Sequence, residues 1–226
     1  STAGARCSAV PTSWTACPVG PYREEWGRLV APEVADAGPR TTMTLERAAQ
    51  ALALHRMVEQ NRSSLELRAQ SGLVDDLRRG RIVDEAEATA RAHALGLRPA
   101  LSYVPMTARL SEGAGTDPVL VQQRRVRTLD AVMHAIRSAG HTGLAASRDD
   151  GQIDLVLAPQ RTTAAAGSLD AVLTGVCTEI RRAVARLDGA GACRIGVGPE
   201  SSRLIDAVGG LGEAGHIAEV AMSLPE

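Results

Sequence analysis

The sequence predicts an α+β fold in which one long connecting helix precedes a domain with a central, mostly antiparallel sheet. First, residues 41–80 hold no proline and a single internal glycine (Gly72), and helix-favouring Ala, Leu, Glu, Arg, Gln and Met dominate them. Second, the segments after residue 82 follow the order α-β-α-β-β-α-β-α with a hairpin in the middle. Third, 44% of the residues are hydrophobic, which suffices for a core, although Phe is absent. The core must therefore consist of Leu, Val, Ile and Ala.

Composition excludes several classes of protein. A net charge of -1 argues against a nucleic-acid-binding surface over the whole molecule, and the use of Arg without Lys indicates a GC-rich genome. The cysteines Cys7, Cys17, Cys177 and Cys193 show no metal-ligand spacing, so reduced thiols are expected, with a Cys7–Cys17 bridge as the alternative. No apolar run approaches the roughly 20 residues that cross a bilayer, and no signal peptide is visible. We predict a soluble, cytoplasmic protein with no membrane partner.

Residues 1–40 are interpreted as the remnant of a larger N-terminal domain. They are rich in Gly, Pro, Ser and Ala, and their two apolar islands, 13–19 and 25–31, are candidate strands around a Gly20-Pro21 turn. Two short strands bury too little on their own. We therefore expect them to lean on the first half of the following helix.

Residues 41–80 form the predicted linker and signalling helix. Thr42 or Thr44 can cap its start, and Gly80 after Arg78 and Arg79 is a typical stop. Its first half is apolar on several faces, which predicts burial of Leu45, Ala48, Ala49, Leu52, Leu54, Met57 and Val58. After a polar break at 60–64, the second half carries one stripe, consisting of Leu65, Ala69, Leu73 and Leu77. The stripe either pairs with a second copy of the helix or packs on its own domain. Glu59 and Glu66 interrupt a strict heptad and exclude a long coiled coil.

Residues 81–226 contain the elements of the predicted α+β domain. Asp84 caps a helix over 85–95, and 100–110 is a strand whose Pro105 requires a sheet edge or a bulge. The remaining expected elements are an amphipathic helix over 119–139 (with Val126, Leu129, Val132, Met133 and Ile136 inward), a hairpin over 142–158, a helix from Ser168 to about Leu187, a strand over 194–198, and a final helical region over 203–223. Ser201 or Ser202 would cap that last region, which Gly209, Gly210, Gly212 and Gly215 weaken.

The phrases GLVDDLRRG (72–80), EAEATARAHALG (85–96) and ALSYVPMTARL (100–110) resemble the start of the GGDEF-like domain of PucR/CdaR-type transcriptional regulators. The hairpin with Asp150-Gly151 and the segment IGVGPESSRLIDAVGGLGEAGHIAEVA, with Glu213-Ala214, are similar to later elements of that family. The four glycines after Ser202 depart from its usual continuous helix. The resemblance implies a degenerate GGDEF-like (ferredoxin-like or cyclase-like) regulatory domain over 81–226 and a sensory domain upstream. It also implies a C-terminal helix-turn-helix that would follow Glu226, so DNA would be bound only by a domain missing from this chain.

Two stretches are candidate ligand sites. Active GGDEF cyclases hold Mg²⁺ with carboxylates of a glycine-rich turn and of the first strand, which neutralises charge during phosphoryl transfer. Here the turn is Arg148-Asp149-Asp150-Gly151, and the first strand has no carboxylate. We interpret Asp149 and Asp150 as tight-turn residues, with a cation site as the alternative. The loop Gly196–Ser202 could bind an anion at a helix start, but it lacks a dinucleotide or P-loop fingerprint, so a plain strand–helix turn is favoured.

The other polar groups suggest no chemistry. The basic clusters (Arg78, Arg79, Arg81 and Arg124, Arg125, Arg127) are interpreted as solvated or dipole-compensating helix residues, and the histidines (His55, His93, His134, His141, His216) lack metal-ligand spacing. We therefore assign no catalytic, cofactor-binding or metal-binding residue and expect no cofactor.

The leading hypothesis is a non-enzymatic regulatory and dimerisation fragment of a PucR/CdaR-like transcription factor, homodimeric through the long helix. It would relay an unidentified small-molecule effector signal to the downstream DNA-binding domain. The alternative is a residual nucleotide-binding or diguanylate-cyclase-like domain.

Overall fold

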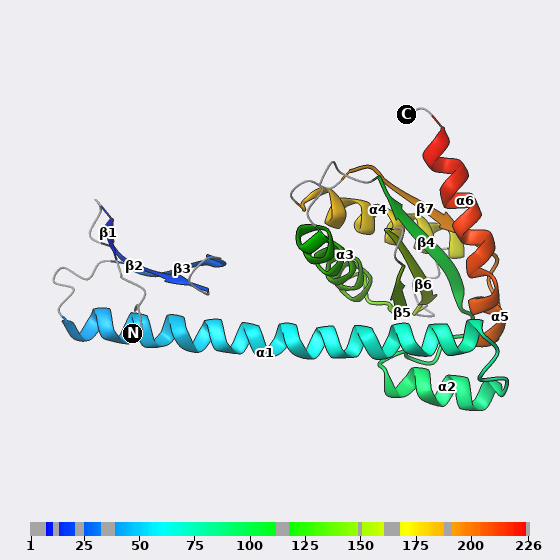
Figure 1. Cartoon of the computed structure of the whole chain (residues 1–226), viewed down its shortest axis with the longest axis horizontal. Coiled ribbons are helices and arrows are strands. Elements are labelled where there is room, and N and C mark those ends of the chain that lie inside the picture. Colours follow the sequence, from blue (N-terminus) through cyan, green and yellow to red (C-terminus); the bar gives the residue numbers. More distant parts are fainter. Residues whose placement is uncertain are drawn as a thin grey trace. The chain divides into compact units, whose positions relative to one another are not determined.

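The computed structural model describes residues 8–10, 14–20, 25–32, 39–111, 118–148, 151–160, 168–187 and 191–224. The chain divides into two compact units, Ser1–Ser63 and Ser64–Glu226, and each is described by itself. Helix α1 (Pro39–Arg78) contributes its first part to one unit and its last part to the other (Figure 1). The boundaries predicted at residues 40 and 80 remain predictions.

Helix α1 confirms the predicted long helix. It runs for 40 residues, and Gly80 follows its end with φ +65°, in the left-handed region that favours glycine. The Gly80 N–H donates to the Leu77 carbonyl at 3.1 Å. This hydrogen bond and the left-handed glycine end the helix, whose last residue is Arg78.

The first unit contains a small antiparallel sheet in the order β1-β2-β3. Its strands are β1 (Ser8–Val10), β2 (Trp14–Val19) and β3 (Gly27–Ala31). Strands β2 and β3 confirm the two predicted islands, whereas β1 was not predicted. Ala16 and Cys17 of β2 are buried, and the guanidinium of Arg56 lies 5.2 Å from the ring centroid of Trp26.

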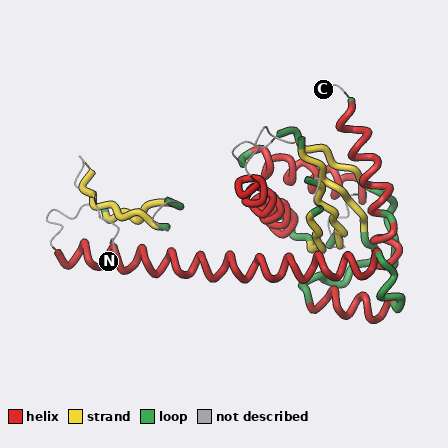
Figure 2. The backbone as a smooth tube through the Cα atoms, in the orientation of Figure 1, coloured by secondary structure: helices red, strands yellow, loops and turns green. Residues whose placement is uncertain are grey.

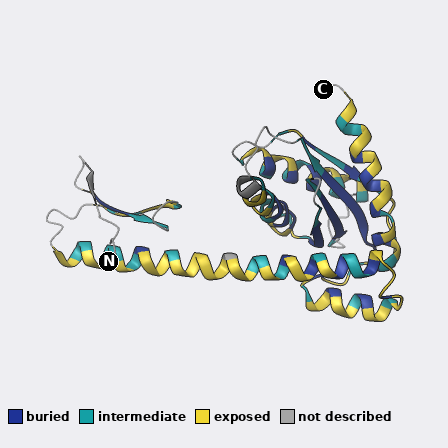
Figure 3. Ribbon diagram, in the orientation of Figure 1, coloured by how far each residue is buried: buried dark blue, intermediate teal, exposed yellow. Residues whose placement is uncertain are grey.

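Burial of the first half of α1 was wrongly predicted. Leu52, Leu54, Met57 and Val58 are 44–63% exposed, while Ala49 is buried. Three short strands offer little apolar surface to a helix of this length. Exposed residues appear as the yellow parts of the α1 ribbon in Figure 3.

The second unit is a two-sided α/β sandwich built on a four-stranded antiparallel sheet (Figure 2). Its elements are α2 (Glu85–Ala94), β4 (Val104–Leu110), α3 (Pro118–Ser138), β5 (Thr142–Ser147), β6 (Gln152–Ala158), α4 (Leu169–Ala185), β7 (Cys193–Val197), α5 (Leu204–Gly209) and α6 (Leu211–Ser223). The strand order β5-β6-β4-β7 and the sequence β4-α3-β5-β6-α4-β7 define a ferredoxin-like βαββαβ arrangement. The predicted fold class and element order are thereby confirmed.

Both faces of this sheet are covered. Helices α3 and α4 pack on the face that includes Met106 and Leu155, while the end of α1, α2, α5 and α6 cover the opposite face, which includes Tyr103 and Val156. Successive residues of a strand point to opposite faces, so each strand supplies apolar side chains to both clusters. Asp84 caps α2 and Ser168 caps α4, as expected.

Pro105 lies in an interior strand and not at a sheet edge, and the predicted alternative, a bulge, is found on the side of β7. Strand β4 is interior, and its register with β6 runs without interruption through the Pro105–Val156 pair. The Pro105 carbonyl accepts a hydrogen bond from the N–H of Gly198, so the missing proline N–H also faces β7. Strand β7 ends at Val197, next to this position. Beyond it the pairing resumes at Tyr103–Ser201 with the register shifted by one residue. Proline is therefore tolerated because the regular ladder with β7 is interrupted beside it.

The predicted stripe on the second half of α1 is only half correct. Leu73 and Leu77 are buried, but Leu65 is 64% exposed and Ala69 is exposed as well. Their place on the buried face is taken by Leu67 and Gln70. Gln70 is 1% exposed because its amide accepts from the Ala145 N–H of β5 and donates to the Leu95 carbonyl. A polar residue thus occupies a position where a hydrophobic pattern predicts none.

The final helical region is divided at Gly210 into α5 and α6, in line with the expected weakening by glycine. The predicted serine cap was wrong. Arg203 holds the cap position without a side-chain hydrogen bond, and the carboxylate of Glu85 in α2 accepts the N–H groups of Leu204 and Ile205. The Ser201 hydroxyl accepts only from the Arg203 N–H. A carboxylate from another helix therefore satisfies the first donors of α5.

Candidate functional site

A fully buried carboxylate, Asp154 of β6, is the centre of the most polar part of the second unit. Its side chain lies on the sheet face covered by α1, and the apolar residues Val156 and Ala158 follow it on that face of the same strand. Its Oδ2 accepts from Arg78 Nη1 and from Arg148 Nε, both at 2.7 Å. Two guanidinium groups thus neutralise one carboxylate that has no access to water.

The second oxygen of Asp154 is also hydrogen-bonded. Gln152 Nε2 donates to Oδ1 at 2.7 Å, and Thr107 Oγ1 of β4 donates to it at 3.3 Å. Thr107 is itself fully buried. Because both Asp154 oxygens have partners, this one carboxylate holds four side chains in place.

Arg148 extends this network to α1. Its Nη1 donates to Oδ1 of Asp75, which lies one helical turn before Arg78, while its Nε donates to Asp154. We call these six residues the Asp154 cluster: Asp75, Arg78, Thr107, Arg148, Gln152 and Asp154. Within it, α1 provides one acid and one base, and the β5–β6 hairpin provides their counterparts. The helix is therefore attached to the sheet by two reciprocal ion pairs.

Burial alone would lower the pKa of Arg148 by disfavouring its charged form. The hydrogen bonds and charges of Asp75 and Asp154 outweigh that effect and raise its pKa above the usual value. Its Nη2 is buried and has no hydrogen-bond partner among the described residues. A rigidly held, always charged guanidinium is suited to fixing geometry rather than to exchanging protons.

The sequence-predicted ligand sites differ in outcome. Asp149 and Asp150 lie outside the described residues. Gly196 belongs to strand β7, and in the loop after it the N–H of Gly198 donates to the Pro105 carbonyl and that of Ser201 to the Tyr103 carbonyl. Both N–H groups are thus engaged by backbone carbonyls, and the preference for a plain strand–helix turn over an anion site stays a prediction.

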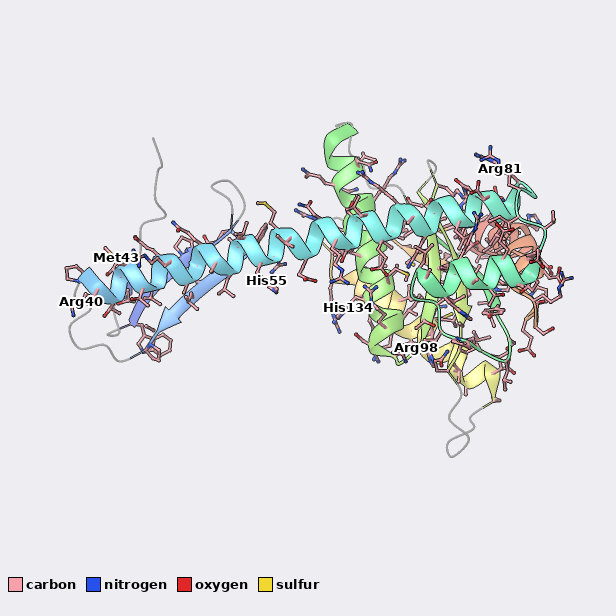
Figure 4. All side chains as sticks on the ribbon, turned by 90° about the horizontal axis from the view of Figure 1, so that it is seen from below. Arg40, Met43, His55, Arg81, Arg98 and His134 are labelled. Carbon is pink, nitrogen blue, oxygen red and sulfur yellow. The ribbon has the colours of Figure 1, made fainter. Side chains whose placement is uncertain are left out.

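The basic and histidine side chains are distributed over separate places. Arg78 lies in the last turn of α1 and is exposed, as the dipole-compensating interpretation requires, and it also pairs with buried Asp154, which was not predicted. Arg81 pairs with Asp76 and projects from the surface beyond the end of α1 (Figure 4). The His134 ring lies near the Ser138 hydroxyl, and His141 accepts from the Gln160 N–H. Among the residues the structure describes, no three His, Cys, Asp or Glu side chains are grouped to hold a metal ion.

Sequence reasoning missed Asp154, although one signal for it exists. In the strand QIDLVLA, Asp154 falls on the same face as two apolar residues. A face with apolar residues is expected to be buried, so the carboxylate is expected to be buried with them. A carboxylate in such a position requires buried cations. The two arginines that meet this requirement are 76 and 6 residues away, and only the second could be proposed from proximity.

Comparisons with known proteins give one family match. Residues 79–220 match the family described as GGDEF-like domain. No curated protein matches the chain. A solved structure similar to it is that of diguanylate cyclase SiaD in complex with its activator SiaC from Pseudomonas aeruginosa, with 18% identity, a TM-score of 0.38, and coverage of 81% of this chain and 71% of that one. In the described part of the chain, no helix is both long and apolar enough to cross a bilayer. The GGDEF-like part of the resemblance is confirmed.

Proposed function

This chain belongs to the GGDEF-like domain family, and we propose that it is a non-enzymatic regulatory and dimerisation segment of a PucR/CdaR-like transcriptional regulator. The observation that supports this most is the Asp154 cluster, which attaches α1 to the sheet by two reciprocal ion pairs. A displacement of α1 must either break these ion pairs or move the β5–β6 hairpin together with the helix. An effector signal reaching α1 would thus be conveyed to the sheet and onward to a helix-turn-helix domain of the regulator, provided that the effector binds two arrangements of α1 with different affinities.

We further propose that the domain has no diguanylate cyclase activity. Strand β4 reads VPMTARL and offers no carboxylate for a metal ion. The buried carboxylate on its neighbour β6, Asp154, is occupied by Arg78 and Arg148. Incubation of the chain with GTP and Mg²⁺ is therefore expected to give no cyclic dinucleotide by chromatography. Product formation above that of an enzyme-free control would contradict the proposal in favour of the nucleotide-processing alternative.

The dimerisation proposal rests on exposed apolar side chains of α1. Leu54, Val58 and Leu65 are 63%, 55% and 64% exposed. Spacings of four and seven residues place them on one side of a helix. Met43 and His55, labelled in Figure 4, lie on the same helix, and Met43 is also exposed. A row of apolar side chains along an exposed helix is best buried against the same row of a second copy.

Replacing Val58 with arginine is expected to weaken dimerisation about tenfold or more. Each dimer would bury two copies of this side chain, and burying one valine is worth about 1.5 kcal/mol or more. Sedimentation equilibrium of the whole chain measures the dissociation constant. His55→Arg is the control, because His55 follows Leu54 directly and is therefore turned about 100° away from it around the helix. This substitution introduces the same side chain and is expected to leave the dissociation constant of the dimer nearly unchanged. A wild-type chain that stays monomeric at high concentration would refute the dimer.

A further inference from the structure

A pocket of about 160 Å³ lies within the second unit, between α1, α3 and the end of β5. Its apolar wall consists of Leu67, Val126 and Leu129, of which Leu67 and Leu129 belong to the core. The rest of its lining is polar, and it comprises Ser64, Arg68, Ser71, Gln122, Arg125 and Ser147. Three separate elements therefore converge on one hollow.

The lining is positively charged. Arg68 of α1 and Arg125 of α3 reach the pocket from different helices, and none of the described residues that line it is a carboxylate. Guanidinium groups are the side chains best suited to binding oxyanions, because their N–H groups form a fork. The hydroxyls of Ser64, Ser71 and Ser147 add short donors to the same space.

The size of the pocket limits the ligand. Pockets for drug-sized ligands measure about 300–1,000 Å³, so this one does not enclose a nucleotide. Donors from three elements, α1, α3 and β5, line the pocket. A phosphate has more acceptor oxygens than a carboxylate and can accept from more of these donors at once.

We propose that this pocket binds a phosphate group, free or carried by a small molecule, with Arg68 and Arg125 as its charge partners. The pocket adjoins the Asp154 cluster: Ser71 lies one helical turn before Asp75, and Ser147 directly precedes Arg148. A bound phosphate therefore bridges the two elements that the Asp75–Arg148 pair already joins. Its role as an effector rests on the proposed function, whereas the site itself does not.

Isothermal titration calorimetry with inorganic phosphate, at low ionic strength and with the whole chain, tests the site. Arg68→Gln and Arg125→Gln are each expected to weaken binding about tenfold or more, since a hydrogen-bonded charge contributes roughly 1.5–3 kcal/mol. The matched control is Arg79→Gln, which removes the same charge from an exposed position on the chain just after α1, and it is expected to bind like the wild type. Ser71→Leu fills the pocket without changing its charge and is expected to abolish binding. Thermal melting shows whether each variant is folded.

The proposal is overturned if titration of the wild-type protein with phosphate shows no heat of binding. It is also overturned if the folded Arg68 and Ser71 variants bind phosphate as the wild type does. A stronger affinity for acetate than for phosphate also overturns it. GTP binding that exceeds phosphate binding and disappears in Arg68→Gln would replace it by a nucleotide site. Phosphate binding by a chain that proves monomeric supports the site while refuting the proposed dimer, so the two failures are distinguishable.

Discussion

Replacing Asp154 with alanine is expected to lower the free energy of unfolding of the second unit by about 3 kcal/mol. Removing one partner of a buried ion pair usually costs about 3–5 kcal/mol, because the remaining charge stays desolvated. The lower end applies here because the side chains of Arg78 and Arg148 are 37% and 24% exposed and Arg148 keeps Asp75. Asp154→Asn preserves volume and should cost nearly as much, since it too removes the charge.

Urea denaturation followed by circular dichroism measures this loss. The control is Glu179→Ala, which breaks an ion pair with Arg182 on the surface of α4, where both side chains are about half exposed. Such a pair contributes about 0.5 kcal/mol or less. Equal losses for Asp154→Ala and Glu179→Ala would show that the Asp154 cluster does not hold α1 to the sheet.

Replacing Gly196 with alanine is expected to cost about 3 kcal/mol in the free energy of unfolding, despite adding a single methyl group. A Cβ on this residue of β7 would lie 2.0 Å from the carbonyl oxygen of Ala214 and 2.6 Å from the nitrogen of Ala218. Both atoms belong to the backbone of α6, which cannot rotate aside as a side chain can. The helix must move off the strand, and overpacking of this kind costs about 1–3 kcal/mol or more.

Gly212→Ala is the matched control for this substitution. A Cβ at Gly212 of α6 meets no atom within 4 Å, and alanine is about 1 kcal/mol better than glycine inside a helix. Near the helix start it should therefore be neutral or slightly stabilising by the same denaturation assay. If Gly196→Ala were equally harmless, the close contact between α6 and β7 would be contradicted.

Hydrophobic periodicity and turn residues were sufficient to predict most elements of the second unit. Apolar positions three and four residues apart identified α3, and Asp150-Gly151 between two apolar runs identified the β5–β6 hairpin. These signals are local, because they arise from the geometry of one helix or one turn. Such local signals therefore predict the order and the type of the elements.

The features that were wrongly predicted or left open depend on distant partners. Leu65 and Leu67 are equally apolar, and only the packing of α1 on the sheet decides that Leu67 is the buried one. Pro105 is acceptable in an interior strand because the regular ladder with β7 is interrupted beside it. The glycine-rich stretch around Gly196 resembled an anion loop, whereas its real cause is the approach of α6. None of these partners is near in sequence.

The side chain of Gln70 has a consequence for where this domain begins. Strand β5 is an edge of the sheet, and edge strands with free backbone groups readily pair with other chains. The Gln70 side chain accepts a hydrogen bond from the Ala145 N–H of that edge, and Leu73, Val74 and Leu77 cover the core beside it. A polypeptide limited to the family match at residues 79–220 would lack all four residues, and its edge strand β5 would be free to pair with other chains. The smallest autonomous folding unit of this chain therefore includes the last turns of α1, upstream of the homologous region.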